Sequence, residues 1–364
     1  MDEIFAAERL LLARHRRGLN KTQLAKRVGV TASTITAFER ADREPPSETV
    51  ARLAEVLDFP VDFFFTEMTN SLPLDAASFR SLARMTAGQR NAALASGTLA
   101  IHLNEWITNK YRLPEADVPE LDPVVIDPEG AARHVRTHWG LGLLPIPNVL
   151  RRLEAHGIRV FALGVEYREV DAFSFWDNGT PYIIAGTHKT PERQVFDLAH
   201  ELGHLVLHRD HAKPRGRDEE RQADAFASNF LMPREDVIRA APRSASLASL
   251  AKAKHRWRVS LAALAFRLHS LNLITDWHYH TLCVQIASVI GRDKEVDSLP
   301  REQSQTLTKV LALMREDGLS RADLAAALHV HQPEIDGLLG GLVVSVIDGG
   351  GEGGEPTPPT LRLV

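Results

Sequence analysis

The chain has 364 residues, a length that suggests about two or three domains. Of these residues 44% are hydrophobic and 25% are charged, a balance typical of globular proteins. Its 43 lysine and arginine residues against 47 aspartate and glutamate residues give a net charge of −4, so the chain as a whole is not basic. The single cysteine, Cys283, excludes disulfide bonds within the chain. Because neither an apolar leader nor an apolar run of membrane-spanning length is present, we expect a cytoplasmic protein without membrane contact.

Residues 1–66 are expected to form a domain of short helices. Apolar residues at helical spacing, with helix-starting threonines at Thr22 and Thr31, predict helices over residues 4–16, 22–28, 31–40 and 50–57. Between Arg9 and Arg43 the chain carries nine Lys or Arg residues against two acids, so positive charge is concentrated here. Two short helices joined by a turn at Gly29, inside such a bundle, are typical of a helix-turn-helix.

Residues 6–59 resemble the XRE family of phage-repressor-like DNA-binding domains. The resemblance is carried by Leu19, Thr22, Gln23, Leu24, Ala25, Val28, Gly29, Val30, Ile35, Phe38, Glu39, Pro46, Ser47, Leu53 and Ala54. It implies that the helix beginning at Thr31 reads double-stranded operator DNA. The implied base-facing residues are Ala32, Ser33, Thr36 and Ala37, and the implied phosphate-binding residues are Gln23, Arg40 and Arg43. Small side chains leave the operator sequence open, and a bundle used only for protein contacts remains an alternative.

Residues 67–123 are expected to form a helical connector. One or two helices are predicted over residues 78–111, and the proline-rich residues 113–123 are expected to mark a domain boundary.

Residues 124–285 are expected to form an α+β domain. Helices are predicted over residues 129–139 and 147–156, and strands over residues 158–163, 172–176 and 181–185. The pair Asn178-Gly179 is typical of a hairpin turn between the last two strands. One exposed edge of this short sheet could hold a peptide as an added strand.

His200, Glu201 and His204 form an HExxH motif within an apolar run that predicts a helix. Residues four apart lie on one helix face, so both imidazoles can bind one zinc ion while Glu201 is placed to take a proton from the attacking water. The motif also occurs by chance, so a third metal ligand is needed to distinguish a zinc site from a chance match.

A second helix is predicted around residues 219–227 and supplies that ligand. Glu220 and Asp224 are four apart and share a face, so Glu220 can bind the metal while Asp224 accepts the outer N–H of a ligand histidine. Glu219, His208 and His211 are alternative third ligands. A three-histidine site of the known spacing is excluded, because Leu207 and Asp210 stand where it needs glycine and histidine.

Three blocks of residues 130–235 resemble the ImmA/IrrE family of metallopeptidases: residues 195–208, residues 220–227 and Leu231-Met232-Pro233. The resemblance implies a zincin-like fold in which a small sheet packs on the HExxH helix. It also implies a DNA-binding repressor as substrate. The residue that stabilises the oxyanion is left open among His208, Tyr182 and His188.

The C-terminal part is expected to be helical over residues 247–271 and 286–345, followed by a disordered tail at residues 346–364. Residues 307–339 echo the helix-turn-helix pattern but carry few bases, which favours a bundle for contact in a homodimer over a second DNA reader.

Together these features predict a multi-domain protein: an all-α helix-turn-helix bundle, an α+β zincin-like metallopeptidase domain and a helical C-terminal region. The predicted function is a DNA-binding transcription regulator fused to a zinc endopeptidase that cleaves a repressor or antitoxin-type protein. Two alternatives remain: a regulator whose peptidase fold is only a sensor or dimerisation scaffold, and a repressor that cleaves itself within residues 66–120.

Overall fold

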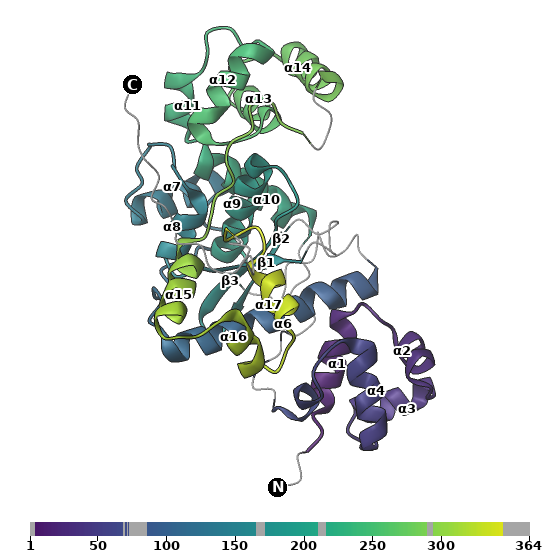
Figure 1. Ribbon diagram of the computed structural model, residues 1–364. Helices are drawn as coiled ribbons and strands as arrows, with labels where there is room; N and C mark the ends of the chain where they lie inside the picture. Colours follow the sequence, from purple (N-terminus) through teal and green to yellow (C-terminus); the bar gives the residue numbers. More distant parts are fainter. Residues whose placement is uncertain are drawn as a thin grey trace, which may run out of the picture.

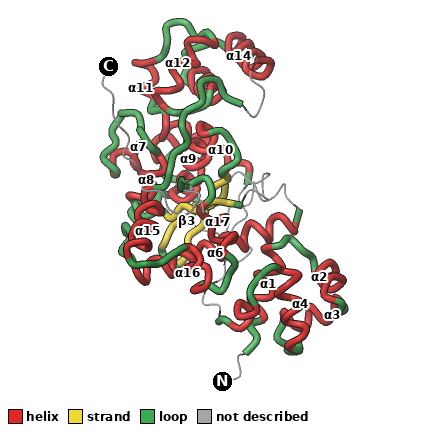
Figure 2. Tube along the Cα trace, in the orientation of Figure 1, coloured by secondary structure: helices red, strands yellow, loops and turns green. Residues whose placement is uncertain are grey.

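The chain forms an elongated molecule in which helices surround one small sheet (Figure 1). The computed structural model describes residues 4–67, 70, 72, 86–164, 172–209, 216–289 and 294–344. The predicted tail at residues 346–364 and the alternative ligand His211 lie outside the described residues. Figure 2 shows the strands enclosed in the middle of the molecule, with the N-terminal helices at one end. Within the described parts of the chain, no helix combines the length and the hydropathy that a membrane span requires.

The N-terminal bundle contains the four expected helices and a short 3₁₀ helix. They are α1 (Ala7–Arg16), α2 (Lys21–Val28), α3 (Ala32–Glu39), α4 (Ser47–Leu57) and η1 (Val61–Phe65). Their inner faces share a core of Leu10, Leu24, Ile35, Phe38, Leu53 and Phe63. Asn20, and not Thr22, caps α2, because its side chain accepts the backbone N–H of Gln23 at 2.8 Å while the Gln23 side chain accepts the N–H of Asn20 at 2.8 Å. Gly29 makes the expected turn with φ of 78°.

A long helix, α6 (Ala87–Lys110), joins this bundle to the sheet. At its N-terminal end Gly88 meets Gly18 so closely that a Cβ there would lie 2.9 Å from the Gly18 carbonyl oxygen. Near its other end Asn104 donates to the Tyr182 hydroxyl at 2.8 Å. Residues 78–85 of the helical stretch expected over residues 78–111 lie outside the described residues, so a helix there stays a prediction.

The proline-rich segment at residues 113–123 lies on the surface but is hydrogen-bonded to the α+β domain. The Asp117 backbone N–H donates to His156 and the Leu121 N–H donates to Val206, both at 3.0 Å. The Asp117 carboxylate also bonds His138 and His156, at 2.5 and 2.9 Å. Residue composition does not reveal such distant partners, and the domain boundary expected at these residues stays a prediction.

The sheet has three strands in the order β1-β3-β2, with β1 (Arg159–Leu163) parallel to β3 (Thr180–Gly186) and β2 (Ala172–Asp177) antiparallel to it. Asn178 and Gly179 make the predicted hairpin turn, both with positive φ, 45° and 79°. The register places Tyr182 opposite Phe175 and Ile183 opposite Ser174. Since side chains alternate along a strand, the face with Tyr182 meets α6 and the face with Ser174 meets the helix described next.

Four helices build the other side of the domain. They are α7 (Pro128–His138), α8 (Val149–Ala155), α9 (Pro191–Leu207) and α10 (Arg217–Leu231). Helix α9 crosses the sheet face, and α10 packs along α9. Gly203 of α9 allows this close approach, because a Cβ there would lie only 3.0–3.2 Å from atoms of the Phe226 side chain on α10.

A helical cap follows, formed by α11 (Arg234–Ala240), α12 (Leu247–Trp257), α13 (Leu261–Ser270) and α14 (Asp276–Val289). Trp257 is buried in the core, whereas Phe266 is 52% exposed. Buried Asp236 accepts hydrogen bonds from Arg256, Arg239 and Trp257. The bonds from Arg256, which outweigh burial, lower the pKa of Asp236 to about 2.

The last three helices, α15 (Gln305–Glu316), α16 (Arg321–Ala327) and α17 (Gln332–Leu339), form a second small bundle. Helix α17 packs against β1, and its buried Glu334 accepts hydrogen bonds from Arg16 at 2.7 Å and from Arg17 at 2.6 Å. Within the helix-turn-helix-like pattern of residues 307–339, α17 corresponds to the recognition helix, and it packs against the rest of the chain. A homodimer stays a prediction.

Candidate metal centre and nucleic-acid interface

The candidate metal centre begins on α9, which presents His200 and His204 one turn apart. The helix is well started, with Thr190 as its N-cap and Pro191 in its first turn. His204 is fully buried and His200 is partly exposed. Their Nε2 atoms lie 3.1 Å apart, so both lone pairs can converge on one point.

Glu220 of α10 completes a cluster with these two histidines. Its carboxylate oxygens lie 3.6 Å from His200 Nε2 and 3.5 Å from His204 Nε2, and one ligand atom from each of the three residues lies within 4.8 Å of the others. Ligand atoms of a tetrahedral zinc ion with bonds of about 2.0–2.1 Å lie roughly 3.3 Å apart. The three residues therefore fit a small tetrahedral cation in both chemistry and spacing.

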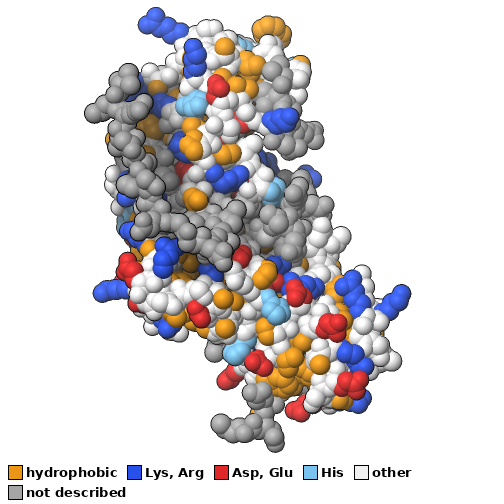
Figure 3. Space-filling view, viewed as in Figure 1, with side chains coloured by type: hydrophobic (Ala, Val, Ile, Leu, Met, Phe, Trp, Pro, Cys, Tyr) orange, Lys and Arg blue, Asp and Glu red, His pale blue; other side chains and the backbone are white. Residues whose placement is uncertain are grey.

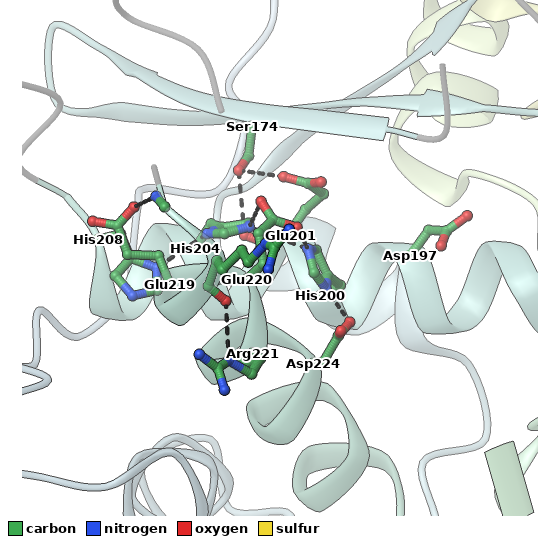
Figure 4. A network of polar contacts seen from close by, with 12 residues as sticks. Ser174, Asp197, His200, Glu201, His204, His208, Glu219, Glu220, Arg221 and Asp224 are labelled. Atoms are coloured by element: carbon green, nitrogen blue, oxygen red, sulfur yellow. Dashed lines mark hydrogen bonds and ion pairs between the residues drawn. The ribbon is translucent and has the colours of Figure 1, made fainter. Parts of the chain in front are cut away.

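Glu201 approaches the same place from the side of the sheet (Figure 4). Its carboxylate accepts a hydrogen bond of 2.6 Å from the hydroxyl of buried Ser174 on β2. Ser174 was not among the residues singled out from the sequence, because no local pattern shows that this strand faces α9. The hydrogen bond gives the Glu201 carboxylate a fixed orientation.

The outer nitrogens of the two histidines have different partners (Figure 4). His200 Nδ1 lies 2.9 Å from Asp224 Oδ1, the contact expected from the sequence. His204 Nδ1 lies 3.0 Å from His208 Nδ1, and His208 Nε2 lies 2.8 Å from Gln222 Oε1. Neither His208 nor Gln222 was expected in this role, although the spacing of four between His204 and His208 on a helix could have indicated their contact.

The electrostatics of the cluster favour positive charge. Burial alone lowers the pKa of His200, but hydrogen bonds to Asp224 and Glu220, with the charge of Glu201, outweigh it and raise the pKa to about 10. Burial likewise acts to raise the pKa of Glu220, but the hydrogen bonds with His200 and His204 hold it far below its usual range. The carboxylates stabilise a cation here, whether protons or a metal ion carry the charge.

The other candidates are placed differently. Glu219 accepts the backbone N–H of Gly216 at 2.8 Å and so caps α10. Burial raises the pKa of Tyr182 well above its usual range. Its hydroxyl lies on the sheet face that meets α6, where it accepts from Asn104, and so points away from the cluster and from any oxyanion formed there. His188 is exposed in the loop before α9.

The second candidate surface is α3 with the turn before it. Thr31 caps α3 through the N–H of Thr34. Ser33 is exposed, with its hydroxyl 2.8 Å from that of Thr31, and Thr36 donates to the Ala32 carbonyl at 3.0 Å. Ala37 is half-buried. Of these side chains, Ser33 is the most open to a base edge.

The predicted phosphate-binding residues lie around this helix. Gln23, Arg40 and Arg43 are exposed. The side-chain amide oxygen of Gln23 already accepts the backbone N–H of Asn20 in the cap of α2. Figure 3 shows Lys and Arg side chains at the outer edge of the bundle, beside acidic ones.

The charge count of the sequence overstates how basic this surface is. Five of the nine bases bond partners within the chain: Arg9, Arg14, Arg16, Arg17 and Lys21. Conversely, Glu39 is neutralised by Arg14 and Lys21. The positive charge without such partners in the bonds above is therefore concentrated in α2 and in the residues that follow α3.

Comparison with known families decides what these two sites belong to. Residues 10–64 match the family model of a helix-turn-helix, and residues 153–269 match that of the IrrE N-terminal-like domain, a peptidase family. The chain joins a helix-turn-helix domain to an IrrE-like peptidase domain.

Both resemblances predicted from the sequence are thus confirmed. The peptidase match contains His200, Glu201, His204 and Glu220, and the helix-turn-helix match supports DNA binding. No curated protein matched the chain.

Proposed function

We propose that this protein is a DNA-binding transcription regulator that also cleaves a repressor-type protein as a zinc metalloendopeptidase of the zincin type. The observation that carries the proposal is the convergence of His200, His204 and Glu220 at tetrahedral spacing, with Glu201 beside them. The match to a peptidase family supports the reaction class, and the helix-turn-helix supports the DNA-binding half.

In this proposal His200, His204 and Glu220 hold zinc, which when bound supplies a Lewis acid that polarises a peptide carbonyl and acidifies water. Glu201 takes the proton of the attacking water and delivers it to the amine that leaves. Ser174 keeps the Glu201 carboxylate aimed at the site through its hydrogen bond of 2.6 Å. Asp224 fixes the ring of His200 from behind.

The edge of β2 is the proposed place for the substrate backbone. In the described sheet β2 pairs on one side only, with β3, and its Ser174 lies next to Glu201. The opposite edge, β1, has α17 packed against it. An extended peptide that pairs with β2 would present its carbonyl groups alongside the catalytic residues.

For the DNA-binding half we propose that α3 enters the major groove. Ser33 and Thr36 with the methyl groups of Ala32 and Ala37 would face the bases, and the exposed Arg40 and Arg43 would bind phosphates. Thr31, which caps the N-terminus of α3, is exposed, and residues at this end of a recognition helix are the ones that contact base edges.

The self-cleavage alternative is less well supported. It requires an accessible peptide bond within residues 66–120. Most of the described part of that stretch belongs to α6, whose central residues are buried, or is hydrogen-bonded to the peptidase domain. The scaffold alternative is addressed by the experiment below.

The test uses the full chain and the repressor encoded nearest to its gene. Wild type and Glu201→Gln are compared, with zinc content measured by elemental analysis and cleavage by mass spectrometry of the products. The proposal expects about one zinc per chain in both proteins and cleavage only by wild type. Zinc in both proteins without cleavage of this repressor would support the scaffold alternative.

A further inference from the structure

The two ligand histidines are held from behind by chemically different groups. A carboxylate, Asp224, faces His200 Nδ1 at 2.9 Å. A second imidazole, His208, faces His204 Nδ1 at 3.0 Å, and an uncharged amide, that of Gln222, faces the far side of His208 at 2.8 Å. His204 and His208 are both buried, so these contacts are made out of bulk water.

The tautomer of His204 determines which group donates and which accepts in each of these contacts. To offer Nε2 to a metal, His204 must carry its proton on Nδ1. That N–H then donates to His208 Nδ1, which must be the unprotonated nitrogen of its ring. The His208 proton consequently lies on Nε2, where the Gln222 carbonyl oxygen accepts it. Each of these two contacts then joins one donor to one acceptor.

We propose that His208 and Gln222 are positioning residues that fix the tautomer and the ring orientation of His204 for metal binding. This rests on the proposed function, because it takes His204 as a zinc ligand. His208 is held for this task at the C-terminal end of α9, where its backbone N–H bonds the His204 carbonyl at 2.9 Å. Gln222 comes from α10, the helix that also supplies Glu220.

A positioning role for residue 208 requires an acceptor atom that faces His204, whereas a packing role requires only a side chain of similar volume. The acceptor for His204 is Nδ1, which the amide of asparagine can replace because its Oδ1 lies at a similar distance from the backbone. Leucine fills comparable space without any acceptor. At position 222 glutamate keeps an acceptor oxygen and leucine removes it.

The experiment measures the zinc affinity of the full chain by competition with a chromophoric chelator for wild type, His208→Asn, His208→Leu, Gln222→Glu and Gln222→Leu. Loss of a hydrogen-bond partner behind a ligand histidine typically weakens metal binding by 10–100-fold. We expect a loss of about that size for His208→Leu, a smaller loss for Gln222→Leu, and affinities within about threefold of wild type for the two variants that keep an acceptor. Visible spectra of the cobalt-loaded proteins should change only in the leucine variants.

The outcomes separate this inference from the proposed function. If wild type binds no zinc or cobalt, the proposed function itself fails. If wild type binds zinc and His208→Leu binds it equally well, the positioning role is wrong while the proposed function stands. Equal weakening by His208→Asn and His208→Leu would also overturn the inference, because packing would then account for both. Circular dichroism of the metal-free variants checks that each is folded.

Discussion

Glu334 of α17 is expected to hold the C-terminal bundle against the DNA-binding domain. Its buried carboxylate accepts from Arg16 and Arg17 of α1. Glu334→Gln keeps the shape but leaves two guanidinium groups beside an uncharged amide. Breaking a buried ion pair by removing one partner typically costs about 3–5 kcal/mol. Because the Arg17 side chain is 21% exposed and also bonds Leu57 and Asp58, we expect the lower end, about 3 kcal/mol.

The assay is hydrogen exchange of the full chain, followed peptide by peptide. A cost of about 3 kcal/mol in docking should accelerate exchange in α17 and at the facing end of α1 by roughly 100-fold where undocking limits exchange. Asp336→Asn on the same helix is the matched control. Asp336 pairs with Arg321 at 3.0 Å, with side chains 40% and 28% exposed, so its loss should cost about 1 kcal/mol or less. Equal exchange in the two variants would refute the reasoning.

Three further predictions concern the two sites and the cap. Glu220→Ala should lose most bound zinc while Glu201→Gln keeps it and loses cleavage; stoichiometric zinc in Glu220→Ala would exclude Glu220 as a ligand. Arg43→Ala should weaken binding to all duplexes alike, with a shallower salt dependence, whereas Ser33→Ala should change sequence preference; binding titrations with two operators at several salt concentrations decide this. Because folding lowers the pKa of Asp236 from 3.8 to about 2, Asp236→Asn should cost up to ~2 kcal/mol at neutral pH, and its difference from wild type in urea unfolding should shrink as pH falls from about 4 to about 2.

Features set by neighbouring residues could be predicted from the sequence. The turn at Asn178-Gly179 and the helix that carries His200 and His204 depend on local backbone preference and periodicity, and the structure has both where they were expected. The cap of α2 shows the limit of such reasoning. Thr22 and Asn20 are both good capping residues, and the reciprocal bond between Asn20 and Gln23 decides between them.

Features set by distant contacts could not be predicted. Ser174 reaches Glu201 only because β2 lies over α9, and Gln222 reaches His208 only because Gly203 lets α10 approach. Exposure of Phe266 likewise depends on how α13 packs, not on its apolar side chain. Helical periodicity marks one face as apolar but does not say what covers it.

The packed segments between the two halves change how DNA binding and proteolysis can be connected. The fusion alone, with its proline-rich residues 113–123, suggests two domains on a flexible tether that raises the local concentration of substrate. Instead, α6 contacts both the bundle and the sheet, and Glu334 ties α17 to α1. Domains docked in this way fix both the direction and the distance from the DNA-binding helix to the peptidase site. Operator DNA should therefore accelerate cleavage of a repressor bound at one spacing and on one face of the duplex, and moving the repressor site by half a helical turn should abolish that effect. Acceleration that is indifferent to this half-turn would show that the halves separate in solution and that a tether describes them better.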